Sequence, residues 1–185
     1  MLNILYVHGF ASNQNSRSFT ELKSSFLNHN FFASDFDLLD VKGTLKKIDT
    51  LCKEKNIDLI IGKSLGGFYT LAYEGFQNKI VINPCIKPWI EIPKLDSSVK
   101  ESVLDEWKKI FEQTENSINK DHKKRTFGIF GDKDELFSYK NYFDKHYGAE
   151  NNGKQKSFMI PGKHHIDSEN LKIAVQKGLD YFNLE

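Results

Sequence analysis

Residues 62–66 read Gly-Lys-Ser-Leu-Gly and form the pattern G-x-S-x-G, which can present the hydroxyl of Ser64 as a nucleophile. The pattern follows a short apolar run at residues 59–61 and precedes a segment with helical character. A strand-to-helix turn of this kind is too tight for large side chains beside the serine, and the flanking glycines remove that clash. A glycine-rich turn without chemistry is the alternative. A phosphate-binding loop needs the spacing G-x-x-x-x-G-K-[ST], which this segment lacks.

A serine that attacks a carbonyl carbon needs two donors for the negative charge that develops on the carbonyl oxygen. We expect the amide of Leu65, directly after the serine, to be one donor and the amide of Phe10 to be the other. Phe10 follows an expected strand, and Gly9 allows the backbone to turn into the cleft. We interpret His8 as a structural residue that holds this loop through hydrogen bonds, in preference to a proton carrier.

The serine also needs a general base, and the base needs a carboxylate to orient it. With this serine motif, the order along the chain is serine, acid, histidine. Residues 131–135 read Gly-Asp-Lys-Asp-Glu and follow an expected strand. We expect Asp134 to be the acid because it lies past the turn, with Asp132 and Glu135 as alternatives. In isolation, this segment would be read as a solvated acidic loop.

The expected base lies in residues 161–166, which read Pro-Gly-Lys-His-His-Ile and follow the last expected strand. His164 fits the pattern of a histidine two residues before an apolar one, here Ile166. Counting from the end of the strand would favour His165 instead. We predict His164 and keep His165 as the alternative. The two histidines are adjacent and lack the spacing of metal ligands, so we expect neither a metal nor another cofactor.

Short apolar runs alternate with amphipathic segments along the chain, which is typical of a mainly parallel sheet covered by helices on both faces. The expected strands are residues 4–7, 31–36, 59–61, 79–82, 127–130 and 157–160. The expected helices are residues 18–28, 44–55, 65–75, 138–147 and 169–182. The sequence therefore predicts the α/β class, as a three-layer α/β/α sandwich with about six strands. Each candidate site residue then follows the end of a strand.

Residues 85–125 interrupt this alternation and contain Trp89, Trp107 and a charged helical stretch. We expect them to form a short cap-like insert over one edge of the sheet, within a single domain of residues 1–185. The two tryptophans are expected either to shape an apolar substrate pocket or to pack in the core.

The composition excludes several classes of protein. The 26 basic and 25 acidic residues are interspersed, which argues against a nucleic-acid-binding domain. The two cysteines, Cys52 and Cys85, are too few for a disulfide framework and indicate a reducing compartment. No segment approaches the roughly 20 apolar residues of a membrane span, and the first ten residues do not read as a signal peptide. We therefore expect a cytoplasmic protein that does not bind membranes.

Taken together, these segments resemble the small bacterial α/β-hydrolases of the YqiA esterase type. The resemblance is carried, in the family's order, by residues 6–12, 62–69, 82–84, 87–88, 131–135 and 162–166. It implies a compact α/β-hydrolase core that begins at the family's third strand, and activity on short or medium acyl esters or on thioesters. It also implies Ser64 as nucleophile, an acid within residues 132–135 and a base at residues 164–165. Lys63 departs from the family, which commonly has a small residue there, and Gly-Lys-His-His at residues 162–165 replaces a Gly-Gly-Asp-His type run.

The sequence thus predicts a serine esterase that cleaves carboxylic esters through Ser64, His164, Asp134 and an acyl-enzyme intermediate. The same groups would serve an acyl-thioesterase, an acyltransferase or a hydrolase of carbon–carbon bonds. A non-catalytic ligand-binding protein on the same scaffold is the alternative from another class. The expected partner is a small-molecule ester or thioester, and the oligomeric state stays open.

Overall fold

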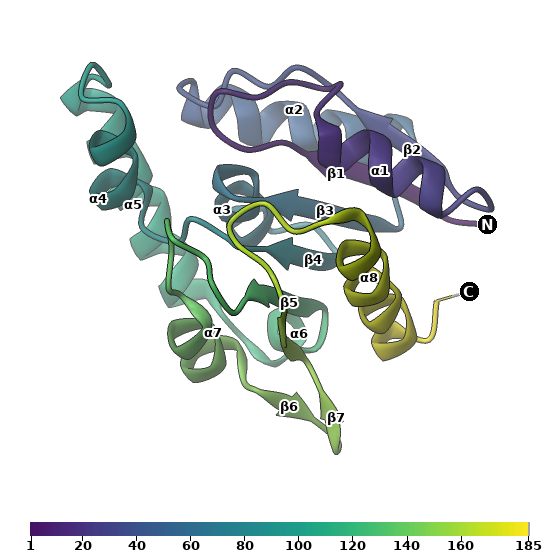
Figure 1. Ribbon diagram of the computed structural model, residues 1–185. Helices are drawn as coiled ribbons and strands as arrows, with labels where there is room; N and C mark the ends of the chain where they lie inside the picture. Colours follow the sequence, from purple (N-terminus) through teal and green to yellow (C-terminus); the bar gives the residue numbers. More distant parts are fainter. Residues whose placement is uncertain (185) are drawn as a thin grey trace.

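The computed structural model describes residues 1–184 and contains a six-stranded sheet between layers of helices (Figure 1). All neighbouring strands are parallel, and their order across the sheet is β2-β1-β3-β4-β5-β8. The predicted three-layer α/β/α sandwich with a mainly parallel sheet is therefore confirmed. The strands are β1 (Asn3–Val7), β2 (Asn30–Ala33), β3 (Leu59–Lys63), β4 (Asn78–Ile82), β5 (Thr126–Gly131) and β8 (Ser157–Ile160).

Helices cover both faces of this sheet. On one face α1 and α8 pack against the strands, and on the other face α2, α3 and α7 do so (Figure 1). A two-stranded hairpin of β6 (Glu150–Asn151) and β7 (Lys154–Gln155) precedes β8 and was not predicted. The helices are α1 (Arg17–Ser25), α2 (Val41–Glu54), α3 (Leu65–Ala72), α4 (Pro88–Leu95), α5 (Glu101–Ser117), α6 (Lys120–Lys124), α7 (Lys140–Tyr147) and α8 (Ser168–Phe182).

Local sequence explains where these elements form. The side chains of Ser16, Asp40 and Asp167 accept hydrogen bonds from first-turn amides of α1, α2 and α8, which satisfies donors that the helix itself leaves free. In the central strand β3, Ile60 packs toward α2 and α3, while Ile61 packs toward α1 and α8. A strand buried on both faces reads as a continuous apolar run, and this is why β3 could be recognised from sequence. Within the described residues, no helix is both long and apolar enough to cross a bilayer.

The order of the strands creates a crevice beside β1. The chain passes from β1 to β2 at one edge of the sheet and then crosses to β3 on the other side of β1. The loops that leave the carboxyl ends of β1 and β3 therefore diverge, and such a point of divergence is where open α/β sheets bind ligands. The predicted site residues follow the carboxyl ends of β1, β3, β5 and β8, so all of them lie at this edge.

The segment 85–125 contains α4, α5 and α6, and α5 packs against α2 and α3 on the second face of the sheet. Through α5 the segment contacts the helices of this face, and its expected role as a cap-like insert stays a prediction. Its position follows from Trp107, which has no exposed surface and donates its indole N–H to the hydroxyl of Tyr69 on α3 at 2.8 Å. Trp89 is half-buried against Phe111, with ring centroids 4.8 Å apart. Trp107 is therefore a core residue.

Candidate active site

Ser64 occupies a strained turn between β3 and α3, with φ +54° and ψ −124°. A positive φ at a residue other than glycine costs on the order of 1–3 kcal/mol and persists only where the surroundings impose it. Here the Ser64 amide donates to the carbonyl of Ile82 at 3.0 Å. The Ser64 carbonyl accepts hydrogen bonds from the amides of Gly67 at 2.9 Å and Cys85 at 3.0 Å. The strand–turn–helix arrangement predicted from the G-x-S-x-G pattern is thus present.

Two glycines of the pattern are required by close packing. A Cβ atom at Gly66 would lie 2.2 Å from the carbonyl oxygen of Val7, and one at Gly62 would lie 2.1 Å from Oγ1 of Thr70. Contacts this short do not occur between real atoms, so larger residues would push α3 away from β1 and β3. The absence of these side chains lets the helix start directly above the ends of both strands.

The loop after β1 is held by His8, whose side chain is buried. Its Nε2 accepts a hydrogen bond from the amide of Phe36 at 3.1 Å, so the ring proton is on Nδ1 and donates to the carbonyl of Gly9 at 2.9 Å. This confirms the interpretation of His8 as a residue that holds the loop. Gly9 in turn packs on the nucleophile turn, since a Cβ there would lie 3.0 Å from Cβ of Ser64.

The amides of Phe10 and Leu65, the predicted oxyanion donors, make no hydrogen bond within residues 1–184. Leu65 is the first residue of α3, so its amide lies outside the hydrogen-bond ladder of the helix and at the positive end of the helix dipole. Phe10 lines the same cleft as Ser64. Both amides are therefore available to an anionic oxygen near the serine.

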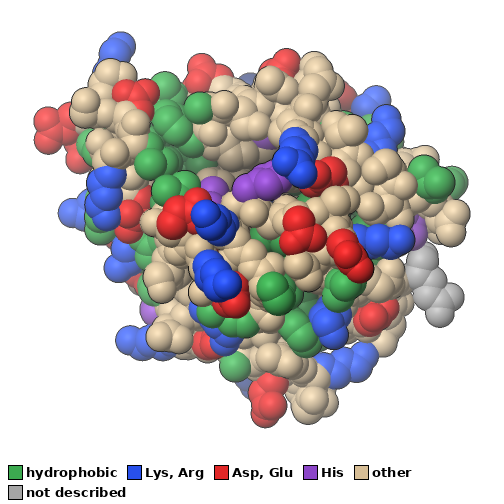
Figure 2. Space-filling view, in the orientation of Figure 1, with side chains coloured by type: hydrophobic (Ala, Val, Ile, Leu, Met, Phe, Trp, Pro, Cys, Tyr) green, Lys and Arg blue, Asp and Glu red, His purple; other side chains and the backbone are tan. Residues whose placement is uncertain are grey.

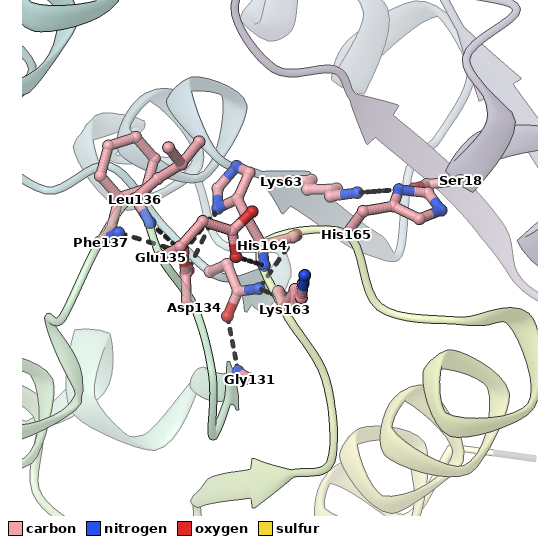
Figure 3. A network of polar contacts seen from close by, with 11 residues as sticks. Ser18, Lys63, Gly131, Asp134, Glu135, Leu136, Phe137, Lys163, His164 and His165 are labelled. Carbon is pink, nitrogen blue, oxygen red and sulfur yellow. Dashed lines mark hydrogen bonds and ion pairs between the residues drawn. The ribbon is translucent and has the colours of Figure 1, made fainter.

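His164 and Asp134 form a close pair (Figure 3). The Nδ1 atom of His164 lies 3.1 Å and 3.2 Å from the two carboxylate oxygens of Asp134. The Asp134 side chain is 4% exposed, and its Oδ1 accepts hydrogen bonds from the amides of Leu136 at 2.9 Å and Phe137 at 3.1 Å. The Phe137 ring packs edge-on against the imidazole at 4.9 Å. These contacts orient Nδ1 toward the carboxylate and leave Nε2 without a hydrogen bond inside the described chain.

Asp132 and Glu135, the two alternative acids, accept hydrogen bonds from backbone amides and do not contact the imidazole of His164. Asp132 accepts a hydrogen bond from the amide of Gly162 at 2.9 Å. Glu135 accepts one from the amide of His164 at 3.1 Å, and this bond lowers the pKa of the Glu135 carboxyl. Among residues 1–184, the carboxylate that contacts the His164 ring is that of Asp134.

His165 points away from Asp134 (Figure 3). Its Nδ1 lies 3.2 Å from Nζ of Lys63, and the same ammonium donates to Oγ of Ser18 at 2.9 Å. Burial and the neighbouring Lys63 charge lower the pKa of His165. Since the ammonium can only donate, Nδ1 of His165 is the acceptor and its ring proton is on Nε2. The structure therefore brings His164, and not His165, to the predicted acid.

Asn83 joins the loops that carry the acid and the base. It is 1% exposed, follows β4 and has a φ of +43°. Its Nδ2 donates to the carbonyls of Lys163 and His164, both at 3.1 Å, and its Oδ1 accepts from the amide of Gly131 at 2.7 Å. In the sequence, residues 82–84 contribute only to the family resemblance, and this role of Asn83 was not predicted. An asparagine at the carboxyl end of a central strand was the available signal.

These loops enclose a cleft of about 270 Å³. Ser64, His164 and Phe10 line it, together with Lys63, His165 and Ser18. Figure 2 shows histidine side chains exposed near the middle of this face, with basic and acidic side chains beside them. Within residues 1–184, no part of the segment 85–125 lines this cleft. Of the two alternatives, Trp107 follows the second and packs in the core, and Trp89 packs against Phe111.

Within the described chain, no three His, Cys, Asp or Glu side chains are grouped closely enough to hold a metal ion. Cys52 and Cys85 are buried and unpaired, and burial raises the pKa of both thiols. Neither cysteine lines the cleft that contains Ser64.

A model of the uncharacterised protein family UPF0227 matches residues 3–152. The chain belongs to this family. The matched residues of this UPF0227 member include Ser64 and Asp134, and the match ends before the loop that carries His164. No curated protein matches the chain.

Solved structures show which fold this UPF0227 member has. Est1E from Butyrivibrio proteoclasticus is 16% identical, with a TM-score of 0.65 over 97% of this chain and 88% of Est1E. A protein from Xanthomonas campestris pv. campestris assigned to the alpha/beta hydrolase superfamily is 13% identical, with a TM-score of 0.63 over 99% of each chain. An esterase domain from Rhodothermus marinus is 14% identical, with a TM-score of 0.60 over 98% of this chain and 86% of the domain. The fold is therefore that of the α/β-hydrolases.

Proposed function

We propose that this UPF0227 member is a serine hydrolase that cleaves carboxylic esters of short acyl chains. The observation that carries the proposal is the Asp134–His164 pair, which shares one cleft with Ser64 on its strained turn. The fold supports it further, because Est1E and the Rhodothermus marinus esterase domain have the same fold. The small volume of the cleft, about 270 Å³, favours short acyl chains over long ones.

In this mechanism, Nε2 of His164 takes the proton of the Ser64 hydroxyl as Oγ attacks the carbonyl carbon of the ester. Asp134 holds the imidazole in the required tautomer and stabilises the imidazolium that forms. The negative charge on the former carbonyl oxygen is met by the amides of Phe10 and Leu65. The strained turn holds Ser64 at the start of α3, in the cleft that His164 also lines.

The tetrahedral intermediate then collapses. The imidazolium of His164 gives its proton to the leaving alkoxide, the ester C–O bond breaks, and the acyl group stays on Oγ of Ser64. A water molecule then attacks the acyl carbon while His164 again accepts a proton, and the acid is released from the regenerated serine. A thiolate leaving group would follow the same course, so activity on thioesters is part of the same test.

A fluorophosphonate probe tests the proposal directly, because it labels only a serine that an adjacent base activates. We expect labelling of the wild-type protein and of Ser12→Ala, an exposed serine in the same cleft, and no labelling of Ser64→Ala. Mass spectrometry of the labelled peptide should locate the adduct at Ser64. If the wild-type protein is folded by circular dichroism and stays unlabelled, the proposal fails and a non-catalytic ligand-binding role takes its place.

A panel of 4-nitrophenyl esters from acetate to octanoate, with the matching acyl thioesters, then defines the substrate. We expect kcat/KM to fall as the acyl chain lengthens. A maximum at octanoate would contradict the inference drawn from the volume of the cleft.

A further inference from the structure

Lys63 places a positive charge next to the nucleophile. Its side chain is half-buried and lines the same cleft as Ser64. The partners of its Nζ atom are both uncharged, namely Oγ of Ser18 at 2.9 Å and Nδ1 of His165 at 3.2 Å. Within the described residues Lys63 forms no ion pair. A partly desolvated ammonium without a counter-ion is unfavourable, and an anionic ligand in the cleft would relieve that cost.

The two carboxylates whose charges act on Lys63 already have other partners. Oε1 of Glu21 lies 2.7 Å from Nε of Arg17, and Asp134 is paired with His164 at 3.1 Å. Arg17 lines the cleft as well, and its side chain is 70% exposed. The pKa of Lys63 is lowered by burial and by the charge of Arg17, and raised by the two carboxylates. The cleft therefore has one half-buried and one exposed cation on the side of α1.

The groups around Lys63 can all donate a hydrogen bond to an incoming oxygen. The ammonium has three N–H bonds, of which the two contacts use two. The Ser18 hydroxyl accepts from Lys63, carries a proton of its own, and also lies within reach of the Tyr6 hydroxyl. His165 accepts through Nδ1, so its Nε2 carries a proton. An ammonium, a hydroxyl and an imidazole N–H form a set suited to the oxygens of a carboxylate.

We propose that Lys63, Ser18 and His165 form an anion-binding subsite beside Ser64, and that the preferred substrate is an ester that also carries a carboxylate close to the scissile bond. This inference rests on the proposed function. The carboxylate is chosen over a phosphate because one half-buried ammonium matches a single negative charge, whereas a phosphate monoester carries nearly two. Lys63 and Ser64 line the same small cleft, so one substrate can reach both only if its carboxylate lies within a few bonds of the reacting carbonyl.

The test compares two esters of equal shape that differ in charge. Monoethyl succinate carries a carboxylate on the acyl side, and ethyl 4-methylpentanoate replaces it by a neutral branched group. A second pair, 3-acetoxybenzoate and 3-acetoxybenzamide, places the carboxylate, or a neutral amide of the same shape, on the leaving-group side. The quantity measured is the ratio of kcat/KM for the charged ester to that for its neutral partner, so a general effect of a variant on Ser64 cancels.

In the wild-type protein we expect the charged ester of one pair to be preferred, and that pair identifies the side of the scissile bond that faces Lys63. Lys63→Met should lower the ratio by about 10- to 100-fold, the range for loss of a hydrogen bond between charged groups. Lys133→Met removes the same charge from an exposed position outside the cleft and should leave the ratio unchanged. Glu21→Gln removes the opposing negative charge and should raise the ratio.

If Lys63→Met is unfolded, His165→Gln provides the second measurement, because an exposed residue is replaced without disturbing the core. It should lower the ratio about threefold or more, since Lys63 loses one of its two positioning contacts. A ratio that stays at the wild-type value in both variants, with all esters still hydrolysed, overturns the subsite and leaves the proposed function intact. Hydrolysis of none of the esters, together with no fluorophosphonate labelling, defeats the proposed function itself.

Discussion

The imidazole of His164 meets the carboxylate of Asp134 through Nδ1 at 3.1 Å, while the neighbouring His165 turns to Lys63 at 3.2 Å (Figure 3). Two adjacent histidines therefore have separate partners and separate electrostatic surroundings. One lies against a nearly buried carboxylate, and the other lies beside an ammonium. Of the two, only His164 contacts a carboxylate that could orient it as a general base.

Replacement of each histidine by alanine should therefore give unequal results. We expect His164→Ala to lower kcat for a neutral short-chain ester by roughly 10³-fold or more, the usual loss for a member of a catalytic triad. His165→Ala should lower it by less than about tenfold, because the ring makes no contact with Asp134. Steady-state kinetics with 4-nitrophenyl acetate gives both values, and equal losses would remove the basis for assigning the base.

The roles of Asp134 and Asp132 can be distinguished in the same way, by replacing each aspartate with the isosteric asparagine. Asp134→Asn should lower kcat by on the order of 10³- to 10⁴-fold, because the amide no longer fixes the tautomer of His164 or stabilises its cation. Asp132→Asn keeps an oxygen that can accept the hydrogen bond of Gly162 and should change kcat only slightly. A larger loss in Asp132→Asn than in Asp134→Asn would exchange the two assignments.

Asn83 is expected to act by positioning the loops of the acid and the base. Asn83→Ala removes three side-chain hydrogen bonds and leaves a residue with a β-carbon at a φ of +43°. We therefore expect the free energy of unfolding to fall by about 2–4 kcal/mol. Asn83→Gly removes the same bonds but tolerates the backbone conformation, and it should be the more stable of the two. Below the unfolding temperature, both variants should lower kcat with little change in KM. A change in KM alone would indicate substrate binding instead.

A buried lysine far from the cleft makes stability depend on pH. Lys79 is 2% exposed, donates to the carbonyl of Tyr73, and has its pKa lowered by burial to about 7 from 10.5. Between these values the unfolded chain binds a proton that the folded protein does not, so the contribution of Lys79 to the free energy of unfolding rises with pH. Lys79→Met removes that contribution. The free energy of unfolding of Lys79→Met should exceed that of the wild-type protein by the largest amount near pH 7. This difference should shrink by about 1 kcal/mol per pH unit toward pH 10.

Urea unfolding followed by circular dichroism at several pH values measures this difference. Lys108→Met replaces an exposed lysine on α5 and serves as the matched control, with a difference from wild type that does not change over the same range. A constant offset for Lys79→Met would show that the side chain keeps its proton in the folded protein.

The four central strands β1, β3, β4 and β5 could be predicted because they are continuous apolar runs that are buried on both faces. The second strand was predicted at residues 31–36 and ends at Ala33 instead. Beyond it the chain turns so that the amide of Phe36 reaches Nε2 of His8, a contact between residues far apart in sequence. The local pattern of apolar and polar residues carries no information about a hydrogen bond between such distant residues.

The same limit applies to the candidate site. The residue types and the order of Ser64, Asp134 and His164 follow from local motifs, since each comes directly after a strand. The choice between His164 and His165 depends on the backbone direction of their loop, and Asn83 on a different strand holds that loop. The position of the segment 85–125 likewise depends on the hydrogen bond between Trp107 and Tyr69, which no periodicity reveals.

The order of the strands also sets when a nascent chain could first become reactive. The serine turn needs β1, β3 and β4, whereas the proposed base follows β8, which comes later in the chain than all three. β8 joins the sheet only through β5, and parallel pairings between distant segments form slowly. If the proposed triad acts, Ser64 therefore gains its base only after β8 has joined the sheet.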